Sequence, residues 1–344
     1  MTRWPEPELV GGSKSEAPGS WPAHWDGGHN WALVLAAGEG TRLQALTTTA
    51  SGVAIPKQFC SLGGGASLLH EALSRARVVA APDRTCVVVA AQHRPWWQSL
   101  QYSIAAQNII VQPLNRGTAN GILLPLLQIL HRDPHASLLV LPSDHYVRSA
   151  SVLASSLQQA VAQVDRHRDR IILLGFAPEE ADPELGYIVP AGPGMCEVDR
   201  FVEKPALAFA RTLIGQGALW NSLIFAVNAA TLLAAFEERC PQVIREMREI
   251  ITAADGEVVQ RRRLETLYER LPVLDFSRDI ITHCAPRLRV LAVPPCGWSD
   301  LGTPRRVAEA VDRDAPIVRN GSAAAHALGF LDLAAQHILR QPAG

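Results

Sequence analysis

The chain has 344 residues, of which 48% are hydrophobic, and its 32 Lys and Arg residues nearly balance its 33 Asp and Glu residues. A net charge of −1 provides no basic surface for nucleic acid or for an anionic membrane, so we expect neither as a partner. No run of residues is long and apolar enough to span a bilayer. The N-terminus lacks the basic flank and the apolar core of a secretory signal.

Six cysteines are scattered along the chain without the paired spacing of a metal site. Most of them lie in apolar stretches, where we expect buried thiols. Such usage is typical of a reducing compartment, so the predicted location is the cytoplasm. The six are Cys60, Cys86, Cys196, Cys240, Cys284 and Cys296.

Residues 1–29 are rich in Pro, Gly, Ser and Trp and show no periodicity, which favours a flexible N-terminal extension. The tryptophans in this segment leave open whether part of it docks on the domain surface. We expect the main domain over residues 30–304 and a short helical tail over residues 305–344.

From Trp31 onwards, short apolar runs alternate with helical segments of ten or more residues. The expected strands are 32–36, 85–90, 108–112, 137–141 and 170–175, and the expected helices are 68–80, 96–105, 117–130 and 151–168. This alternation predicts an α/β fold with a Rossmann-like, doubly wound, mostly parallel sheet and helices on both faces. Beyond Pro178 the pattern changes. Strands at 185–189 and 196–203 predict a smaller mixed sheet, and further helices are expected at 205–214, 229–239, 241–254 and 261–270 before a late strand at 288–293.

The first strand ends in a glycine-containing loop. Gly38 and Gly40 let the backbone approach a ligand closely, and their N–H groups can bind phosphate oxygens. A loop at the carboxyl end of the first strand is where open α/β sheets bind nucleotides. Arg42 and Lys57 bring positive charge nearby, Arg as a planar fork and Lys as a point charge. For the glycines alone, a tight strand-to-helix turn is the alternative explanation.

Polar segments also follow later strands. Gln112–Thr118 either binds a purine edge or a phosphate, or caps the helix that it begins. Asp144 either holds Mg²⁺, which prefers one or two carboxylates with phosphates and waters, or caps a turn. Glu203-Lys204-Pro205, taken by itself, is a charged strand end before a helix.

Taken together, these segments are similar, in the same order, to the motifs of sugar-phosphate nucleotidyltransferases, from Trp31 to about Thr303. Lys57-Gln58-Phe59 most resembles the mannose-1-phosphate guanylyltransferase branch of that family. The resemblance is carried by Leu35–Leu43, Pro56–Phe59, Gln112–Thr118, Leu141–His145, Glu203–Pro205, Trp220–Ser222 and Trp298–Gly302.

The resemblance implies a role for each segment. The implied catalytic residues are Arg42, Lys57, Asp144 and Asp300, with Mg²⁺ held by the two aspartates. The nucleotide would lie against Ala37, Gly38, Gly40, Thr41, Gln112, Asn115, Gly117 and Thr118. The sugar phosphate would lie against Gly186, Glu203, Lys204 and Asn221, with Glu203 on sugar hydroxyls and Lys204 on the phosphate. The smaller mixed sheet would form this sugar site.

The implied reaction converts GTP and mannose 1-phosphate into GDP-mannose and pyrophosphate by in-line attack on the α-phosphate, and a homodimer is left open. Some positions depart from the family's pattern. Gln44-Ala45 stands where the guanylyl branch has Trp-Pro, and Leu223 stands where Gly is usual. Gly302-Thr303-Pro304 resembles relatives that act on glucose 1-phosphate. Another sugar 1-phosphate or nucleoside triphosphate, and a catalytically silent regulatory homologue, therefore stay open as alternatives.

Overall fold

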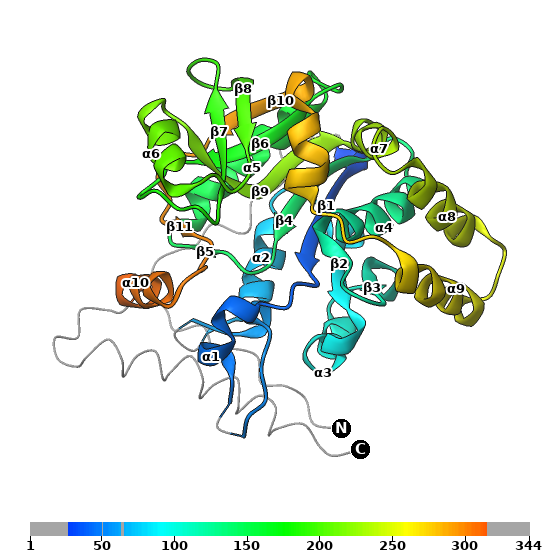
Figure 1. The fold of residues 1–344 in the computed structure, drawn as a ribbon. Coiled ribbons are helices and arrows are strands. Elements are labelled where there is room, and N and C mark those ends of the chain that lie inside the picture. The colour runs from blue at the N-terminus through cyan, green and yellow to red at the C-terminus, as the bar shows by residue number, and fades with distance from the viewer. Residues whose placement is uncertain (1–26, 50, 63–64, 315–344) are drawn as a thin grey trace, which may run out of the picture.

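The structure, a computed structural model, describes residues 27–49, 51–62 and 65–314. Residues 1–26 of the extension predicted over 1–29 lie outside the described residues, as do residues 315–344 of the tail predicted over 305–344. Nine strands form one sheet in the order β3-β2-β1-β4-β9-β6-β10-β8-β7 (Figure 1). The predicted α/β fold class is confirmed.

One half of this sheet is parallel, as predicted. Its strands are β3 (Ile109–Gln112), β2 (Thr85–Ala90), β1 (Asn30–Ala36) and β4 (Ser137–Pro142). Val34 of β1 lies opposite Val87 of β2, and Leu33 lies opposite Val140 of β4. Because helices cover both faces, nearly every residue of β1, β2 and β4 is buried, which explains their continuous apolar sequence.

The other half is mixed. Its strands are β9 (Leu219–Asn228), β6 (Ile171–Phe176), β10 (Leu288–Ala292), β8 (Cys196–Val202) and β7 (Gly186–Pro190). β9 runs antiparallel to both β4 and β6, β8 pairs with β10, and β7 pairs with β8 and with β9. The smaller sheet expected from the sequence is therefore joined to the main sheet by hydrogen bonds at β9 and at β10. A separate pair of short strands, β5 (Tyr146–Val147) and β11 (Trp298–Ser299), lies beside it.

Two local expectations were wrong. β9 was not predicted, because Asn228 both ends this strand and caps the following helix with its side chain, so no turn residues mark the boundary. The helix expected at 96–105 is instead α3 (Arg94–Trp97) followed by a 3₁₀ segment, Gln98–Tyr102. In the segment 96–105 only Leu100 and Ile104 are buried, too few to hold a long amphipathic helix.

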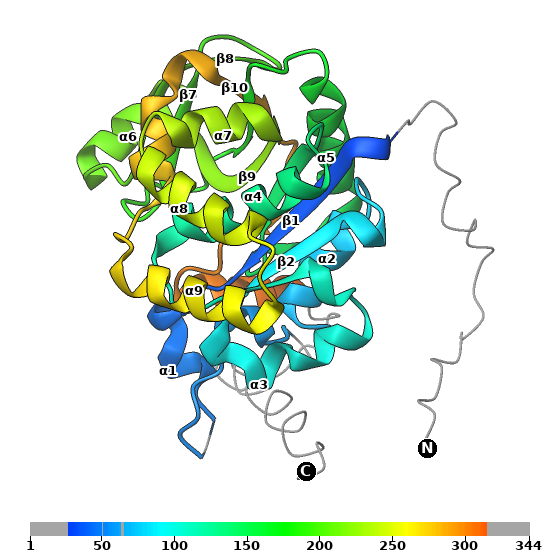
Figure 2. The same cartoon turned by 90° about the vertical axis from the view of Figure 1, so that its right-hand side faces the viewer.

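The helices form two layers around the sheet. One layer contains α4 (Gly117–Arg132), α7 (Ala229–Glu237), α8 (Pro241–Thr252) and α9 (Glu257–Arg270), which lie in front of the sheet in Figure 2. The other contains α2 (Leu68–Ala76), α5 (Ala150–Val164) and α6 (Leu207–Gly215). Alternate residues of one strand pack against the two different helix layers. Leu33 faces the first, whereas Ala32 and Val34 face the second.

The end of the sheet at which β1 finishes carries the short helix α1 (Gln44–Thr47) and, beside it, α10 (Pro304–Asp314) (Figure 1). Ser67 caps α2, since its hydroxyl accepts a hydrogen bond from the His70 backbone N–H. The six cysteines are free and buried, also as predicted. Within the described ranges, no helix combines the length and the apolar character needed to cross a membrane.

A β-bulge between β6 and β9 determines where the Trp220–Ser222 motif lies. Leu173 lies opposite Phe225, but Gly175 lies opposite Asn221, so β9 has extra residues between these pairs. Leu223 falls in this interval and has φ 59°, in the left-handed region. The bulge leaves Asn221 paired with Gly186 of β7 as well. The strand is thereby redirected, and the Trp220–Ser222 motif lies next to β7.

We predict that Gly175→Ala lowers the free energy of unfolding by about 1–3 kcal/mol, because overpacking a filled site forces its neighbours apart. A Cβ at Gly175 would lie 2.7 Å from Leu219 Cδ1 and 2.8 Å from Leu219 Cβ. Gly192→Ala is the matched control, since a Cβ there meets nothing within 4 Å. Urea unfolding measures both, and equal stability of the two variants would contradict the packing described at the bulge.

Candidate functional site

Half of the predicted site residues meet in one cavity, here called the central cavity, beyond the ends of β1 and β4. Its lining comes from segments that are far apart in the sequence. Eight residues of the predicted site line it, namely Arg42, Thr118, Asp144, Gly186, Glu203, Lys204, Asn221 and Asp300. The structure therefore brings together the predicted catalytic aspartates and the predicted sugar-phosphate residues.

Lys57 lies at the centre of the predicted catalytic group. Its side chain is buried, and its ammonium lies 2.9 Å from Asp144 Oδ2 and donates to the Asp300 backbone carbonyl at 2.5 Å. Arg42 is more exposed, with a guanidinium nitrogen 3.9 Å from Asp300 Oδ2. A buried ammonium is stable only where such partners replace its water. One lysine thus joins the two aspartates, which come from different strand ends.

The glycine loop is held in place by the residue next to Lys57. The Gln58 amide donates to the carbonyls of Ala36 and Gly38, at 3.0 and 2.9 Å. Gly40 has φ 64°, and a Cβ there would lie 3.1 Å from the Lys57 backbone nitrogen. The loop and the Lys57-Gln58-Phe59 segment therefore pack directly against each other. The loop positions predicted to bind nucleotide are Ala37, Gly38, Gly40 and Thr41, and none of them lines the central cavity itself.

Both aspartates are held in their ionised form. Burial by itself would raise the pKa of Asp144, but the Lys57 ammonium, together with His145 and a backbone hydrogen bond, holds that pKa below its usual value. Burial opposes ionisation at Asp300 too, and there the Arg306 guanidinium keeps the pKa low. Burial also lowers the pKa of His145 to about 4. Its neutral ring accepts a hydrogen bond from Trp298 Nε1 at 3.2 Å, a contact that gives His145 a structural role.

The donor set can be tested against a divalent cation. Asp144 and Asp300 both line the central cavity, and both are ionised. Among the described residues, no group of three or more His, Cys, Asp or Glu side chains could enclose a metal ion. A cation here would take its remaining ligands from phosphates and water, which is the coordination that Mg²⁺ favours. The residues present thus fit a magnesium ion that binds together with a nucleotide.

The opposite side of the cavity carries a carboxylate without a partner. A Cβ at Gly186 would lie 2.6 Å from Glu203 Oε2, so only glycine allows this approach. Glu203 Oε2 is buried and has no hydrogen-bond partner among the described residues. Burial, reinforced by nearby Asp275, raises the pKa of Glu203 to about 7. Asn221 Nδ2 lies beside it and donates to Ser277 Oγ at 3.2 Å. An orphaned oxygen next to an amide is suited to binding hydroxyl groups.

Strained backbone occurs among the residues predicted to bind the sugar phosphate and beside them. Lys204 has φ 46° and Leu223 has φ 59°, and both line the central cavity. Such angles cost a bulky residue of order 1–3 kcal/mol and persist only where the surroundings enforce them. The exposed ammonium of Lys204 lies 3.6 Å from Glu184, which is also on the cavity wall.

The Gln112–Thr118 segment has clear structural contacts. Asn115 Oδ1 accepts from the Gly117 N–H at 3.0 Å, and Arg116 donates to the carbonyls of Tyr268 and Glu269 at the end of α9. Only Thr118 of this segment lines the central cavity. Gln112 is buried at the end of β3, and its Nε2 has no partner among the described residues. The segment therefore begins and anchors α4, and nucleotide binding by it stays a prediction.

Sequence reasoning missed three residues. Asp275 and Ser277 line the cavity beside the π-helical turn Phe276–Ile280, and Arg306 of α10 binds the carboxylate of Asp300. The signal available for Ser277 is a loose similarity of Ser277-Arg278-Asp279 to a Ser-x-Asp segment of the family, and this segment does not include Asp275. Nothing in the local sequence distinguishes Arg306 from Arg305 beside it, because only the fold places one of them against Asp300.

Comparisons with known proteins agree with this geometry. The model of the family described as nucleotidyl transferase matches residues 31–315. Mannose-1-phosphate guanylyltransferase of Escherichia coli K12 is 28% identical over 283 residues, covering 79% of this chain and 57% of its own length. Xanthan biosynthesis protein XanB of Xanthomonas campestris pv. campestris B100 is 28% identical over 276 residues, with the same two coverages of 79% and 57%.

A solved structure, described as mannose-1-phosphate geranyltransferase from Thermus thermophilus, superposes with a TM-score of 0.70 at 29% identity. It covers 84% of this chain, and this chain covers 80% of it. The chain spans somewhat more than half the length of the two curated relatives named above. Since the family model extends over residues 31–315 of 344, the chain belongs to the nucleotidyl transferase family.

Proposed function

We propose that the chain is a mannose-1-phosphate guanylyltransferase that forms GDP-mannose and pyrophosphate from GTP and mannose 1-phosphate. The observation that carries the proposal is the contact of buried Lys57 with both Asp144 and Asp300. These two aspartates line the central cavity together with Glu203 and Asn221. One end of that cavity suits phosphates and a cation, and the other suits sugar hydroxyls. The names of the relatives support this choice of substrates.

The proposed reaction needs no protein nucleophile. An oxygen of the sugar phosphate forms a bond to the α-phosphorus of the nucleotide, and the bond from that phosphorus to the bridging oxygen of the β-phosphate breaks. Pyrophosphate leaves with the electron pair. Catalysis of such a displacement consists of positioning the two phosphates and stabilising charge.

The residues would share this work by charge. Arg42 and Lys57 supply positive charge to the phosphates, and the fork of Arg42 can hold the departing pyrophosphate. Asp144 and Asp300 would hold Mg²⁺, which supplies further positive charge to the phosphates when bound. Lys204 would face the phosphate of the sugar, while Glu203, Asn221 and the backbone at Gly186 would face its hydroxyls.

The nucleobase assignment depends on the predicted nucleotide segment. Gln112 offers a buried amide Nε2 without a partner among the described residues, and such a donor can pair with a carbonyl oxygen on a base edge. Guanine carries one such carbonyl, and uracil and thymine carry two each, so the amide is compatible with more than one nucleotide. The buried free thiols of all six cysteines support the predicted cytoplasmic location.

A second candidate is the same chemistry on a different sugar 1-phosphate. Leu223 lies on the cavity wall with φ 59°, where it takes up space on the sugar side. Leucine at this position favours a sugar whose group facing Leu223 is smaller than that of mannose, or is placed differently. A silent regulatory homologue fits less well, because Lys57, Asp144 and Asp300 keep their mutual contacts.

The test of the proposal is a panel of nucleoside triphosphates and sugar 1-phosphates, assayed for pyrophosphate release with Mg²⁺. We expect GTP with mannose 1-phosphate to give the highest kcat/KM. A preference for another pair would select the second candidate. Absence of turnover with every pair would contradict the enzyme assignment altogether.

We predict that Asp144→Asn and Asp300→Asn each lower turnover at least about a hundredfold, or about 2.7 kcal/mol of transition-state stabilisation. Each change removes one negative charge from the proposed cation site. Asp199→Asn is the matched control, since Asp199 lies on β8, is exposed and does not line the cavity. Steady-state kinetics and thermal unfolding separate catalysis from folding. Near-normal turnover in both site variants would refute the paired role.

A pH dependence follows from Glu203. Its pKa is raised to about 7 in the folded protein, whereas in the unfolded chain the carboxyl has its ordinary pKa of 4.5, so between these pH values the folded state binds the extra proton. The stability that the protonated Glu203 carboxyl gives to the folded state is fully present below pH about 4.5. It is lost as the pH rises through about 7.

We therefore expect Glu203→Gln to gain stability relative to the unmodified protein as the pH is raised from 5 to 8. Urea unfolding at several pH values measures the difference, and Glu184→Gln, an exposed carboxylate on the same cavity, is the control. If the difference between Glu203→Gln and the unmodified protein did not change with pH, Glu203 would titrate normally and the packing around it would be misjudged.

A further inference from the structure

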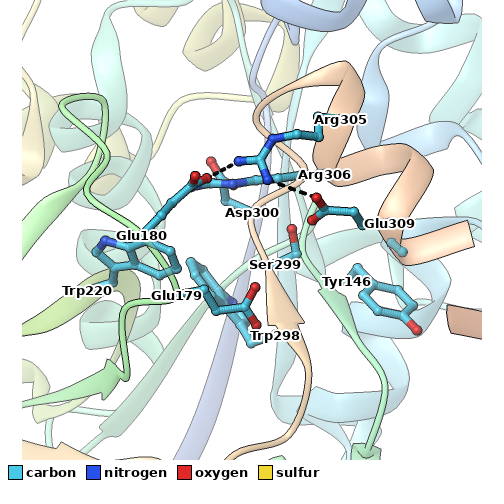
Figure 3. A pocket seen from close by; sticks show the side chains of 11 residues that line it. Tyr146, Glu179, Glu180, Trp220, Trp298, Ser299, Asp300, Arg305, Arg306 and Glu309 are labelled. Carbon is cyan, nitrogen blue, oxygen red and sulfur yellow. Dashed lines mark hydrogen bonds and ion pairs between the residues drawn. The ribbon is translucent and has the colours of Figure 1, made fainter. Parts of the chain in front are cut away.

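A second pocket, here called the α10 pocket, lies beside the central cavity and is drawn in Figure 3. The two share Trp298 and Asp300 in their linings. Two consecutive arginines of α10 line the α10 pocket, and they differ in environment. The side chain of Arg305 is 58% exposed, whereas that of Arg306 is 8% exposed. A guanidinium is rarely so deeply buried unless its charge is paired.

Arg306 holds one particular oxygen of Asp300. Its Nη1 donates to Asp300 Oδ1 at 2.7 Å, and the same oxygen accepts from the Gly302 N–H at 3.0 Å. The second oxygen, Oδ2, lies on the side of Arg42, at 3.9 Å. Oδ1 is thus committed to the protein, and Oδ2 is the oxygen left for a ligand in the central cavity.

Arg306 is itself fixed by other groups. Its Nη2 lies 2.7 Å from Asp182 Oδ2 and 3.4 Å from Glu180 Oε1. The guanidinium also lies over the ring of Trp220, 5.1 Å from the centroid. These contacts come from the segment before β7 and from β9, the elements that carry the sugar side. The planar guanidinium of Arg306 is held at two nitrogens and on one face, so it cannot rotate freely. Its hydrogen bond therefore fixes the orientation of the Asp300 carboxylate.

We propose that Arg306 is a positioning residue, which holds Oδ1 of Asp300 so that Oδ2 is presented to a divalent cation in the central cavity. This inference rests on the proposed function, because it assigns a task to the same site. Its basis is that the two oxygens of the Asp300 carboxylate have different partners: Oδ1 accepts hydrogen bonds from the protein, whereas Oδ2 faces Arg42. Arg306 needs no contact with substrate for this role.

Two physical effects of Arg306 oppose each other. Its positive charge beside Asp300 would weaken binding of a cation, whereas its hydrogen bond would strengthen binding by orienting the ligand oxygen. Asp182 and Glu180 lie against the same guanidinium and compensate much of its charge. Orientation is therefore the larger effect, and hydrogen-bond partners of metal ligands are typically worth roughly 10–100-fold in metal affinity or activity.

The test compares Arg306→Ala with Arg305→Ala. Arg305 is adjacent on α10 and pairs with Glu180 and Glu309 (Figure 3), but it makes no contact with Asp300 among those described. For Arg306→Ala we expect the Mg²⁺ concentration for half-maximal turnover to rise about 10–100-fold, with the KM for sugar phosphate changed less than about threefold. Arg305→Ala should resemble the unmodified protein.

A second readout does not depend on turnover. Thermal unfolding is followed without ligand, with GTP alone, and with GTP plus Mg²⁺. We expect Arg306→Ala to retain the rise in Tm caused by GTP alone and to lose most of the additional rise caused by Mg²⁺. Arg306→Lys should lie in between, because a single ammonium cannot span Asp300 and Asp182 together.

The outcomes separate the two proposals. If GTP plus Mg²⁺ fails to raise the Tm of the unmodified protein, the proposed function fails. If the unmodified protein responds and Arg306→Ala responds equally, or responds to less Mg²⁺, the positioning role is overturned. Should Arg306→Ala not fold, Asp182→Asn provides the test, since it removes an anchor of Arg306 without touching Asp300. We expect it to raise the Mg²⁺ requirement by about 3–10-fold, in the same direction but below the range for outer-shell partners, and an unchanged requirement would overturn the role.

Discussion

The buried ammonium of Lys57 is the interaction on which the site depends. It lies against the Asp144 carboxylate and the Asp300 carbonyl, which belong to segments far apart in the sequence. An unpaired charge at this depth would be expensive, so the three segments are stable only when they are brought together. The neighbouring Gln58 extends the same constraint to the glycine loop through two hydrogen bonds. The glycine loop and the two aspartates are therefore positioned by two consecutive residues.

The sugar side depends on a different constraint, the insertion of β9 between β4 and β6. β9 runs antiparallel to the two strands beside it, and the register of its pairing with β6 shifts between Leu173 and Gly175. Asn221 then lies opposite Gly186 of β7, and the absent side chain of Gly186 leaves room for Glu203. The sheet thus continues from its parallel half into its mixed half without a break.

How far the sequence predicts this structure depends on how local each signal is. The parallel strands and the loop at Gly38 and Gly40 were predicted, because apolar runs and glycines act within a few residues. β9 was missed, since Asn228 ends the strand and begins the helix without a turn. Arg306 was missed for a different reason. Its importance comes from Asp300 and Asp182, whose proximity only the tertiary fold creates. A family resemblance identified the residues predicted to face ligands but not those that support them.

The strained positions point to the same region. Among the described residues, those with positive φ other than glycine are Lys204, Leu223 and Leu301. The first two line the central cavity, and the third directly follows Asp300. Glycine would relieve the strain at each, so the side chains must contribute something that offsets it. At Leu223 that contribution is packing against the core beside the sugar side. At Leu301 it is burial, which fixes the turn that holds Asp300 toward Arg306. Backbone strain in the described residues is therefore concentrated at and beside the central cavity, where side-chain orientation matters. Packing of the surrounding side chains offsets its energetic cost.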